Sequence, residues 1–123
     1  VARDAQGSVN LWLVLGHDNG TTATWIALTS VTLKANAWYH VGCTYRESDR
    51  SFRVRLYDGT TAVEETGTAP KGISVTNAPV YLGNVQEMNW PYDGQLDEMA
   101  VFNDVLSAGE IDAIRQGTYG KSK

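Results

Sequence analysis

The sequence predicts an all-β domain, an antiparallel β-sandwich (jelly roll) with one short C-terminal α-helix. Apolar and polar residues alternate in several short stretches, which is the period of a half-buried strand. Turn pairs such as Asn19-Gly20 and Asp58-Gly59 separate these stretches. One helix signal stands near the C-terminus. Many short strands in succession are typical of a sandwich and not of a βαβ sheet.

The alternation is clearest at the start of the chain, where Val9, Leu11, Leu13 and Leu15 fall on one face. Asn19-Gly20 tolerates positive φ values, so we expect a tight turn there and a second strand that returns beside the first. The expected strands, in order, are residues 8–15, 23–29, 37–45, 52–57, 62–65, 73–75, 80–82 and 95–102.

One short segment near the C-terminus combines several signals for the start and the end of a helix. Ser107 is a good N-cap, and Glu110 stands three residues later, where it can reach back to the Ser107 amide. Leu106 and Ile111 occupy the two positions of a hydrophobic staple, and Gly117 supplies the stop.

The pattern also predicts whether three single residues are buried or exposed. Trp38, in the third strand, is expected in the core. Cys43, the one cysteine, shares the parity of Val41 and Tyr45 and is expected to be a buried, unreactive thiol. His17, in the first turn, is expected at the surface.

Length and composition restrict the class of protein. The 123 residues suit a single domain, assigned to residues 1–119 with a tail at 120–123. The net charge of −4 argues against a duplex nucleic-acid partner, and no apolar run approaches the roughly 20 residues that cross a membrane. Because the chain starts at Val1 and not at a methionine, we expect a processed or truncated product whose targeting segment lies elsewhere.

Four short motifs follow one another in a recognisable order: residues 37–41 (AWYHV), 56–59 (LYDG), 80–83 (VYLG), and 93–99 (DGQLDEM) with 106–111 (LSAGEI). Together they resemble the laminin G-like (LamG-like) jelly-roll domain of the concanavalin A-like lectin/glucanase superfamily, from about residue 11 to residue 117. The resemblance implies an extracellular or cell-surface protein. It also implies one of three functions, because this family includes glycan-binding modules, adhesion domains and some glycosidases.

The same resemblance has a consequence for assembly. Family domains begin with strands for which this chain has no room. We therefore expect either a smaller sandwich, or strands supplied by a partner through homo-oligomer formation or strand donation, because a bare strand edge invites aggregation.

The sequence does not favour an enzyme. Retaining glucanases of this fold resemble one another in a Glu-x-Asp-x-x-Glu strand, which places two carboxylates on one face. No such string occurs here: Glu64 and Glu65 are adjacent and point to opposite faces, and Glu110 serves as a cap. We expect a non-catalytic protein without a cofactor, calcium being the one candidate.

Two tryptophans are candidates for ligand binding on a sheet face. Trp12 and Trp25 have the parity opposite to the aliphatic residues of their strands, so they are expected to share a face near the Asn19-Gly20 turn. A paired indole face can stack on sugar rings. The alternative, which the sequence favours slightly, is that both sheet faces are covered and the pair is core.

A second candidate ligand site is the segment 84–93. It combines the aromatic residues Trp90 and Tyr92 with the amides Asn89 and Gln86. Loops held by a rigid scaffold often carry binding residues. The alternative is that Trp90 plugs the rim of the sandwich, and the two interpretations are equally supported.

Charged residues give two further candidates. Asp97 has the parity of Met99 and Val101, and a carboxylate on an apolar face needs a partner, either structural hydrogen bonds or a calcium ion. Four arginines lie on one hairpin (Arg46, Arg50, Arg53 and Arg55) and could contact acidic glycans. Interleaved Glu47 and Asp49 favour a solvated mixed face instead.

These observations lead to one interpretation with two alternatives. The chain is expected to be a carbohydrate-binding or adhesion module that binds a glycan weakly and belongs to a larger extracellular protein. A structural or oligomerisation sandwich without a small ligand is the first alternative, and a degenerate glycosidase is the second.

Overall fold

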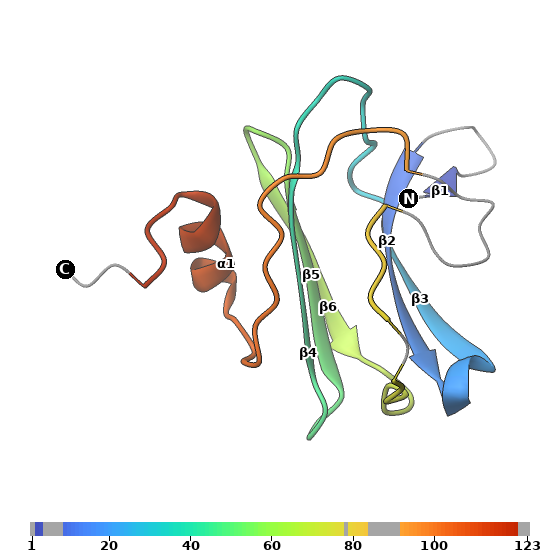
Figure 1. Ribbon diagram of the computed structural model, residues 1–123. Helices are drawn as coiled ribbons and strands as arrows, with labels where there is room; N and C mark the ends of the chain where they lie inside the picture. The colour runs from blue at the N-terminus through green and yellow to red at the C-terminus, as the bar shows by residue number, and fades with distance from the viewer. Residues whose placement is uncertain (1, 4–8, 78, 84–91, 121–123) are drawn as a thin grey trace.

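Two antiparallel sheets pack face to face, and a helix covers the outside of one of them (Figure 1). The computed structural model describes residues 2–3, 9–77, 79–83 and 92–120. The elements are β1 (Ala2–Arg3), β2 (Val9–His17), the 3-10 turn η1 (Asp18–Gly20), β3 (Thr22–Leu28), β4 (His40–Arg46), β5 (Ser51–Tyr57), β6 (Ala62–Thr68) and α1 (Ala108–Arg115). The sandwich and its short C-terminal helix confirm the predicted fold class.

The first sheet has the strand order β1-β2-β3. The β2–β3 hairpin pairs Leu11 with Leu28 and His17 with Thr22. At its tip Asn19 has φ 56° and Gly20 has φ 86°, the left-handed conformations that Asn-Gly tolerates. The turn expected from the sequence is therefore present.

The second sheet has the order β4-β5-β6. The β4–β5 hairpin pairs His40 with Tyr57 and Arg46 with Ser51, and β6 continues the sheet on the far side of β5. The β5–β6 turn is held by Asp58, whose Oδ1 accepts the amides of Thr60 at 2.9 Å and Thr61 at 2.7 Å. These backbone hydrogen bonds lower the pKa of Asp58 because they stabilise the charged carboxylate.

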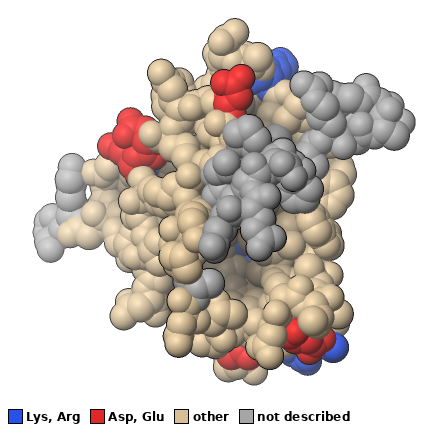
Figure 2. All heavy atoms as spheres, turned by 45° about the vertical axis from the view of Figure 1, so that its right-hand side comes forward, with Lys and Arg blue, Asp and Glu red and all other residues tan. Residues whose placement is uncertain are grey.

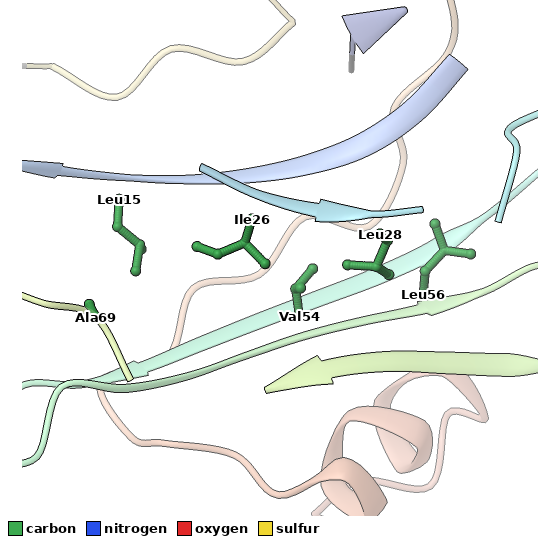
Figure 3. Packing of buried hydrophobic residues seen from close by; sticks show 6 residues of the cluster. All are labelled: Leu15, Ile26, Leu28, Val54, Leu56 and Ala69. Carbon is green, nitrogen blue, oxygen red and sulfur yellow. The ribbon is translucent and has the colours of Figure 1, made fainter. Parts of the chain in front are cut away.

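The core lies between the two sheets, as Figure 3 shows. Leu15, Ile26 and Leu28 of the first sheet point toward Val54 and Leu56 of the second, and Ala69 closes one end. Val54 and Leu56 are fully buried. This arrangement follows from the alternation, which gives each strand one apolar face.

The segment after β6 clamps the tip of the β2–β3 hairpin. His17 is only 2% exposed; its Nδ1 donates to the carbonyl of Gly72, and its Nε2 lies 2.8 Å from Oγ1 of Thr24. The Ser74 amide donates to the Gly16 carbonyl at 2.9 Å, and Lys71 pairs with Asp18. The expectation that His17 is exposed was wrong, because it is the last residue of β2 on the core-facing side and this segment covers it.

The helix begins and ends as its sequence predicts. The Ser107 hydroxyl accepts the Glu110 amide, and the Glu110 carboxylate accepts the Ser107 amide at 2.8 Å, which completes a capping box. At the other end Gly117 has φ 67°, its amide donates to Ile114, and the Thr118 amide donates to Ala113. These are the two hydrogen bonds of a Schellman motif.

Helix α1 lies on the outer face of the second sheet, away from β2 and β3 (Figure 1). Ile111 is 3% exposed and lies directly over Gly42, where a Cβ atom would come within 2.5 Å of Ile111 Cγ2. Beside this contact the Arg55 guanidinium donates two hydrogen bonds to Asp112, at 3.1 and 2.7 Å. Arg115 lies 3.8 Å from the centre of the Tyr57 ring, a cation–π contact.

Three of the expected strands do not form. Residues 73–75, 80–82 and 95–102 have no strand structure, although the last of these segments shares a pocket of about 270 Å³ with β4. Glu98 explains the failure of the last one: its φ is 50°, and its amide donates to the Asp97 side chain at 2.9 Å. A left-handed non-glycine residue interrupts the extended backbone, so no continuous ladder can run through it.

Two expected core residues are at the surface. Trp38 is 61% exposed because β4 begins only at His40, so Trp38 precedes the sheet, and Tyr39 is the residue that packs against the core. Cys43 has the predicted parity, opposite the buried Val54, but it lies on β4, at the edge of the sheet, and is exposed. The predicted parity of Cys43 was correct. The prediction that another layer of the sandwich covers this edge of the sheet was wrong.

We predict that part of this surface is covered by a second protein segment. Val75, Val80 and Val101 are each at least 85% exposed. Light scattering at micromolar concentration should therefore give a mass above that of one chain. A stable monomer whose Leu11–Leu15 amides are protected from hydrogen exchange would contradict this prediction.

We predict that Gly42→Val destabilises the protein by about 1–3 kcal/mol, because the new side chain collides with Ile111. The measurement is urea unfolding. The double variant with Ile111→Ala makes room, so it should lose less than the two single losses added together. Additive losses would show that the helix does not rest on Gly42.

We predict that the Arg55–Asp112 fork makes stability depend on acid pH. Hydrogen bonds from Arg55 lower the pKa of Asp112 below its ordinary 3.8, so its stabilising contribution is complete above the unfolded pKa and is lost as the pH falls through the folded one. The difference in Tm between wild type and Asp112→Asn should shrink as the pH is lowered from 7 toward 2. Glu65→Gln, at an exposed carboxylate, is the control; a pH-independent Asp112→Asn difference would contradict the prediction.

Candidate functional site

The outer face of the first sheet carries a tryptophan pair. In the β2–β3 register Trp12 pairs with Ala27 and Val14 with Trp25, so the two indoles are diagonal neighbours on the face opposite Leu13 and Ile26. Their ring centres are 6.2 Å apart and the rings meet edge to face at 75°. The shared face predicted from the sequence is confirmed.

The pair is not part of the core that the sequence slightly favoured. Trp25 is 57% exposed, while Trp12 is half-buried beside it. The indole N–H of Trp12 is enclosed and has no hydrogen-bond partner in the described part of the chain. An enclosed donor is normally paired, so this N–H is a place where a polar group would be stabilised. Val14, on the same face, is 42% exposed and extends the apolar surface.

Of the segment 84–93, the structure describes only its last two residues. Trp90, Asn89 and Gln86 lie outside the described residues, so their part in a rim site stays a prediction. Tyr92 is 47% exposed, and its amide donates to the Gly83 carbonyl at 2.7 Å. Its ring lies against Gly94, where a Cβ atom would come within 2.8 Å of the ring. An exposed, positioned aromatic ring thus stands at the end of this segment.

Asp97 does not occupy a buried apolar face. It is exposed, as are Met99 and Val101 of the same parity, and its Oδ1 accepts the Glu98 amide. No group of three or more His, Cys, Asp or Glu side chains able to hold a metal ion occurs among the described residues. Asp97 therefore acts as a local turn acceptor here, and its weak candidacy for calcium remains a prediction without support from neighbouring ligands.

Three of the described carboxylates near the second sheet are engaged in structural contacts. Glu64 pairs with Arg53 at 3.0 Å and with Arg55 at 3.3 Å, and Asp112 pairs with Arg55. Glu110 caps the helix, and the Ser107 groups that bind it lower its pKa. These contacts give all three carboxylates a structural role.

Cys43 and His40 lie near each other in sequence and line one pocket, but they do not form a catalytic pair. Successive residues of β4 alternate between faces, so His40 and Cys43, three apart, point to opposite sides. The thiol is enclosed by the pocket although the residue as a whole is exposed, and this desolvation raises its pKa. Desolvation likewise lowers the pKa of His40. A thiol held in its protonated form is a poor nucleophile.

The structure places Arg46 and Arg53, two of the four arginines singled out in the sequence, on one polar surface with hydroxyl side chains. On the outer face of the second sheet, beside helix α1, hydroxyl and guanidinium side chains line a hollow of about 370 Å³. Its residues come from three strands, so the strand register was needed to find it.

These features define a small β-sandwich with two exposed outer faces, one aromatic and one polar. The chain matches the family model Laminin_G_3, described as the concanavalin A-like lectin/glucanases superfamily, over residues 2–112, and it belongs to this family. Searches of curated proteins and of solved structures returned no match. Domains of this family are generally non-catalytic and typically extracellular, and many are carbohydrate-binding or adhesion modules. In the described part of the chain no helix is long and apolar enough to span a membrane.

Proposed function

We propose that this domain is a non-catalytic carbohydrate-binding or adhesion module of a larger extracellular or cell-surface protein. One observation carries the proposal: the Trp12–Trp25 pair stands on the outer face of a sheet with Trp25 57% exposed. Large aromatic residues at a surface, where the core does not need them, supply a flat apolar platform. Sugar rings present C–H faces that match such a platform.

The surroundings of the pair support a neutral ligand. Figure 2 turns the right-hand side of Figure 1, where the first sheet lies, toward the viewer, and most of the described surface in this view is neither acidic nor basic. Strands β2 and β3 contain no Lys, Arg, Asp or Glu.

The rim residues extend this proposal. Tyr92, with Trp90, Asn89 and Gln86 as predicted companions, supplies a second aromatic surface for the same class of ligand. Affinity is expected in the micromolar to millimolar range, because a shallow site makes few contacts. Calcium is the one ion worth including in the assay.

A structural role is the second candidate, favoured by one observation. Val75, Val80 and Val101 are almost fully exposed, and such apolar surface marks contact with another protein segment. In that role the module would assemble without a small ligand. The carboxylates described above are engaged in structural contacts, and they support neither an active nor a degenerate glycosidase.

We predict that Trp25→Ala weakens binding of neutral oligosaccharides at least tenfold and leaves the Tm nearly unchanged, because Trp25 is exposed. The measurement is a screen of an immobilised neutral oligosaccharide panel, with and without calcium, followed by titration of the best binder. Trp38→Ala is the matched control, since Trp38 is 61% exposed and lies apart from the pair.

Two outcomes would contradict this assignment. Unchanged affinity in Trp25→Ala together with loss in Trp90→Ala would move the site to the rim. No binding by the wild-type domain to any neutral oligosaccharide would reject the neutral-glycan function and favour the structural one.

A further inference from the structure

The hydrogen bonds at the two ends of β5 show which of its backbone groups point to which neighbouring strand. The Arg50 carbonyl accepts the Ala69 amide at 2.9 Å, and the Asp58 amide donates to the Thr61 carbonyl at 3.1 Å. Both pairs continue the β5–β6 register. Bonded and non-bonded pairs alternate along an antiparallel ladder. The even-numbered residues of β5 therefore bond to β6, and the odd-numbered residues bond to β4.

Strand β4 consequently leaves three backbone positions open. It is an end strand of its sheet, and its even-numbered residues pair with the odd-numbered residues of β5. The N–H and C=O groups of Val41, Cys43 and Tyr45 therefore point away from β5, and none of them has a backbone hydrogen bond to another described residue. The other end strand, β6, carries Glu64 and Glu65, whereas β4 has no Lys, Arg, Asp or Glu before its last residue. An open, uncharged edge is a template for a further strand.

The open edge borders a groove, which we call the β4 groove. It is the pocket of about 270 Å³ that lies along residues 40–44 of β4, and its other walls are helix α1 and the segment 98–106. This segment runs beside β4 on its way to α1 (Figure 1). Val41, Val101 and Phe102 line the groove and are exposed. A peptide that adds to a sheet edge takes its affinity from main-chain hydrogen bonds and its specificity from pockets for alternate side chains.

The β4 groove has room for one strand and not for a second sheet. Its far wall is held in an irregular shape by local hydrogen bonds: the Glu98 amide donates to Asp97 Oδ1 at 2.9 Å, and the Val105 amide donates to Asp104 Oδ1 at 2.8 Å. This wall therefore does not supply the missing ladder to β4. A second copy paired through its own β4 would bring its β5 to the side where the wall stands. An isolated extended segment is the occupant that fits.

The charges of the β4 groove select a basic segment. Glu98 and Asp104 line it, and no Lys or Arg does. Neither carboxylate forms an ion pair with another described residue. Desolvation lowers the pKa of His40, which also lines the groove, so its side chain is neutral at pH 7. Unpaired carboxylates beside an apolar groove attract Lys and Arg side chains of a partner.

We propose that the β4 groove binds an extended segment of another protein, which adds to β4 as a fourth strand of the second sheet. Its main chain bonds to Val41, Cys43 and Tyr45, its apolar side chains alternate, and its basic side chains lie near Glu98 and Asp104. A small amine would use the carboxylates but not the three open backbone positions. The proposal does not rest on the function proposed for the tryptophan pair.

The test is calorimetric titration of the full chain with the peptide Lys-Val-Thr-Val-Thr-Val-Lys, capped at both ends, together with hydrogen exchange. The amides of Val41, Cys43 and Tyr45 should exchange fast in the free chain and slowly in the complex. The amides of Gly42 and Thr44, which already bond to β5, are the internal control and should exchange slowly in both states.

Two changes test the ladder itself. Cys43→Pro removes an outward N–H and leaves the inward bonds to β5 in place, so the fold should persist and the affinity should fall by about tenfold or more. Two modified peptides keep the test informative if this variant is destabilised: one is N-methylated at its valines and the other at its threonines. Because alternate residues of an added strand face β4, one of these peptides should lose binding and the other should keep it.

The contribution of charge is measured separately. The double variant Glu98→Gln with Asp104→Asn keeps the side-chain acceptors and removes both charges, so binding should weaken and lose its salt dependence. Glu65→Gln, at an exposed carboxylate on β6, is the matched control and should bind as the wild type does.

Four results would overturn the proposal. The first is no binding of the lysine peptide to the wild-type chain. The second is slow exchange of the Val41, Cys43 and Tyr45 amides in the free chain, which would show that the edge is already covered. The third is equal binding of the two N-methylated peptides, which would exclude a ladder. The fourth is equal binding of Glu-Val-Thr-Val-Thr-Val-Glu, which would remove the role of the two carboxylates.

Discussion

The two sheets of this domain share no hydrogen-bonded ladder among the described strands, so their association depends on the apolar side chains between them. Six buried residues form that contact, and Val54 and Leu56 are the largest fully buried side chains among them. Each sheet has one apolar face, and the other sheet is what removes that face from water. Each hairpin therefore needs the other, and every surface feature is positioned by this thin shared core.

Two polar connections support the core from outside it. At one end, Gly72 and Ser74 hold the β2–β3 tip through His17 and Gly16, which ties the segment after β6 to the first sheet. On the outer face, the Arg55–Asp112 fork and the Ile111–Gly42 contact fix the helix. The fork is partly exposed, so its contribution is screened by solvent and the apolar contact carries more of the docking.

Signals from residues close in sequence predicted most of the fold. The features that were missed depend on contacts between segments that are far apart in the sequence. The hairpin at Asn19-Gly20 and the capped helix at Ser107 require only residues close in sequence. Residues 95–102 alternate correctly but form no strand, because a strand needs a partner ladder and Glu98 adopts φ 50°. Likewise the shared face of Trp12 and Trp25 followed from parity, while the exposure of Trp25 depended on how far other layers extend. The sequence singled out Arg46 and Arg53 but not Thr66 and Thr68, because these two line the same hollow from β6 and are placed only by the strand register.

The position of the two candidate surfaces follows from the thinness of the core. Because alternation gives each strand one face to the core, the other face is free to vary without loss of packing. Helix α1 covers only the Gly42 end of the outer face of the second sheet, where the missing side chain of glycine admits Ile111. Thr44 and Arg46, which lie further along β4, are not covered by the helix and line the polar hollow. Val105, in the segment that leads into α1, lines the polar hollow. The first sheet, which has no helix on it among the described residues, keeps Trp25 exposed.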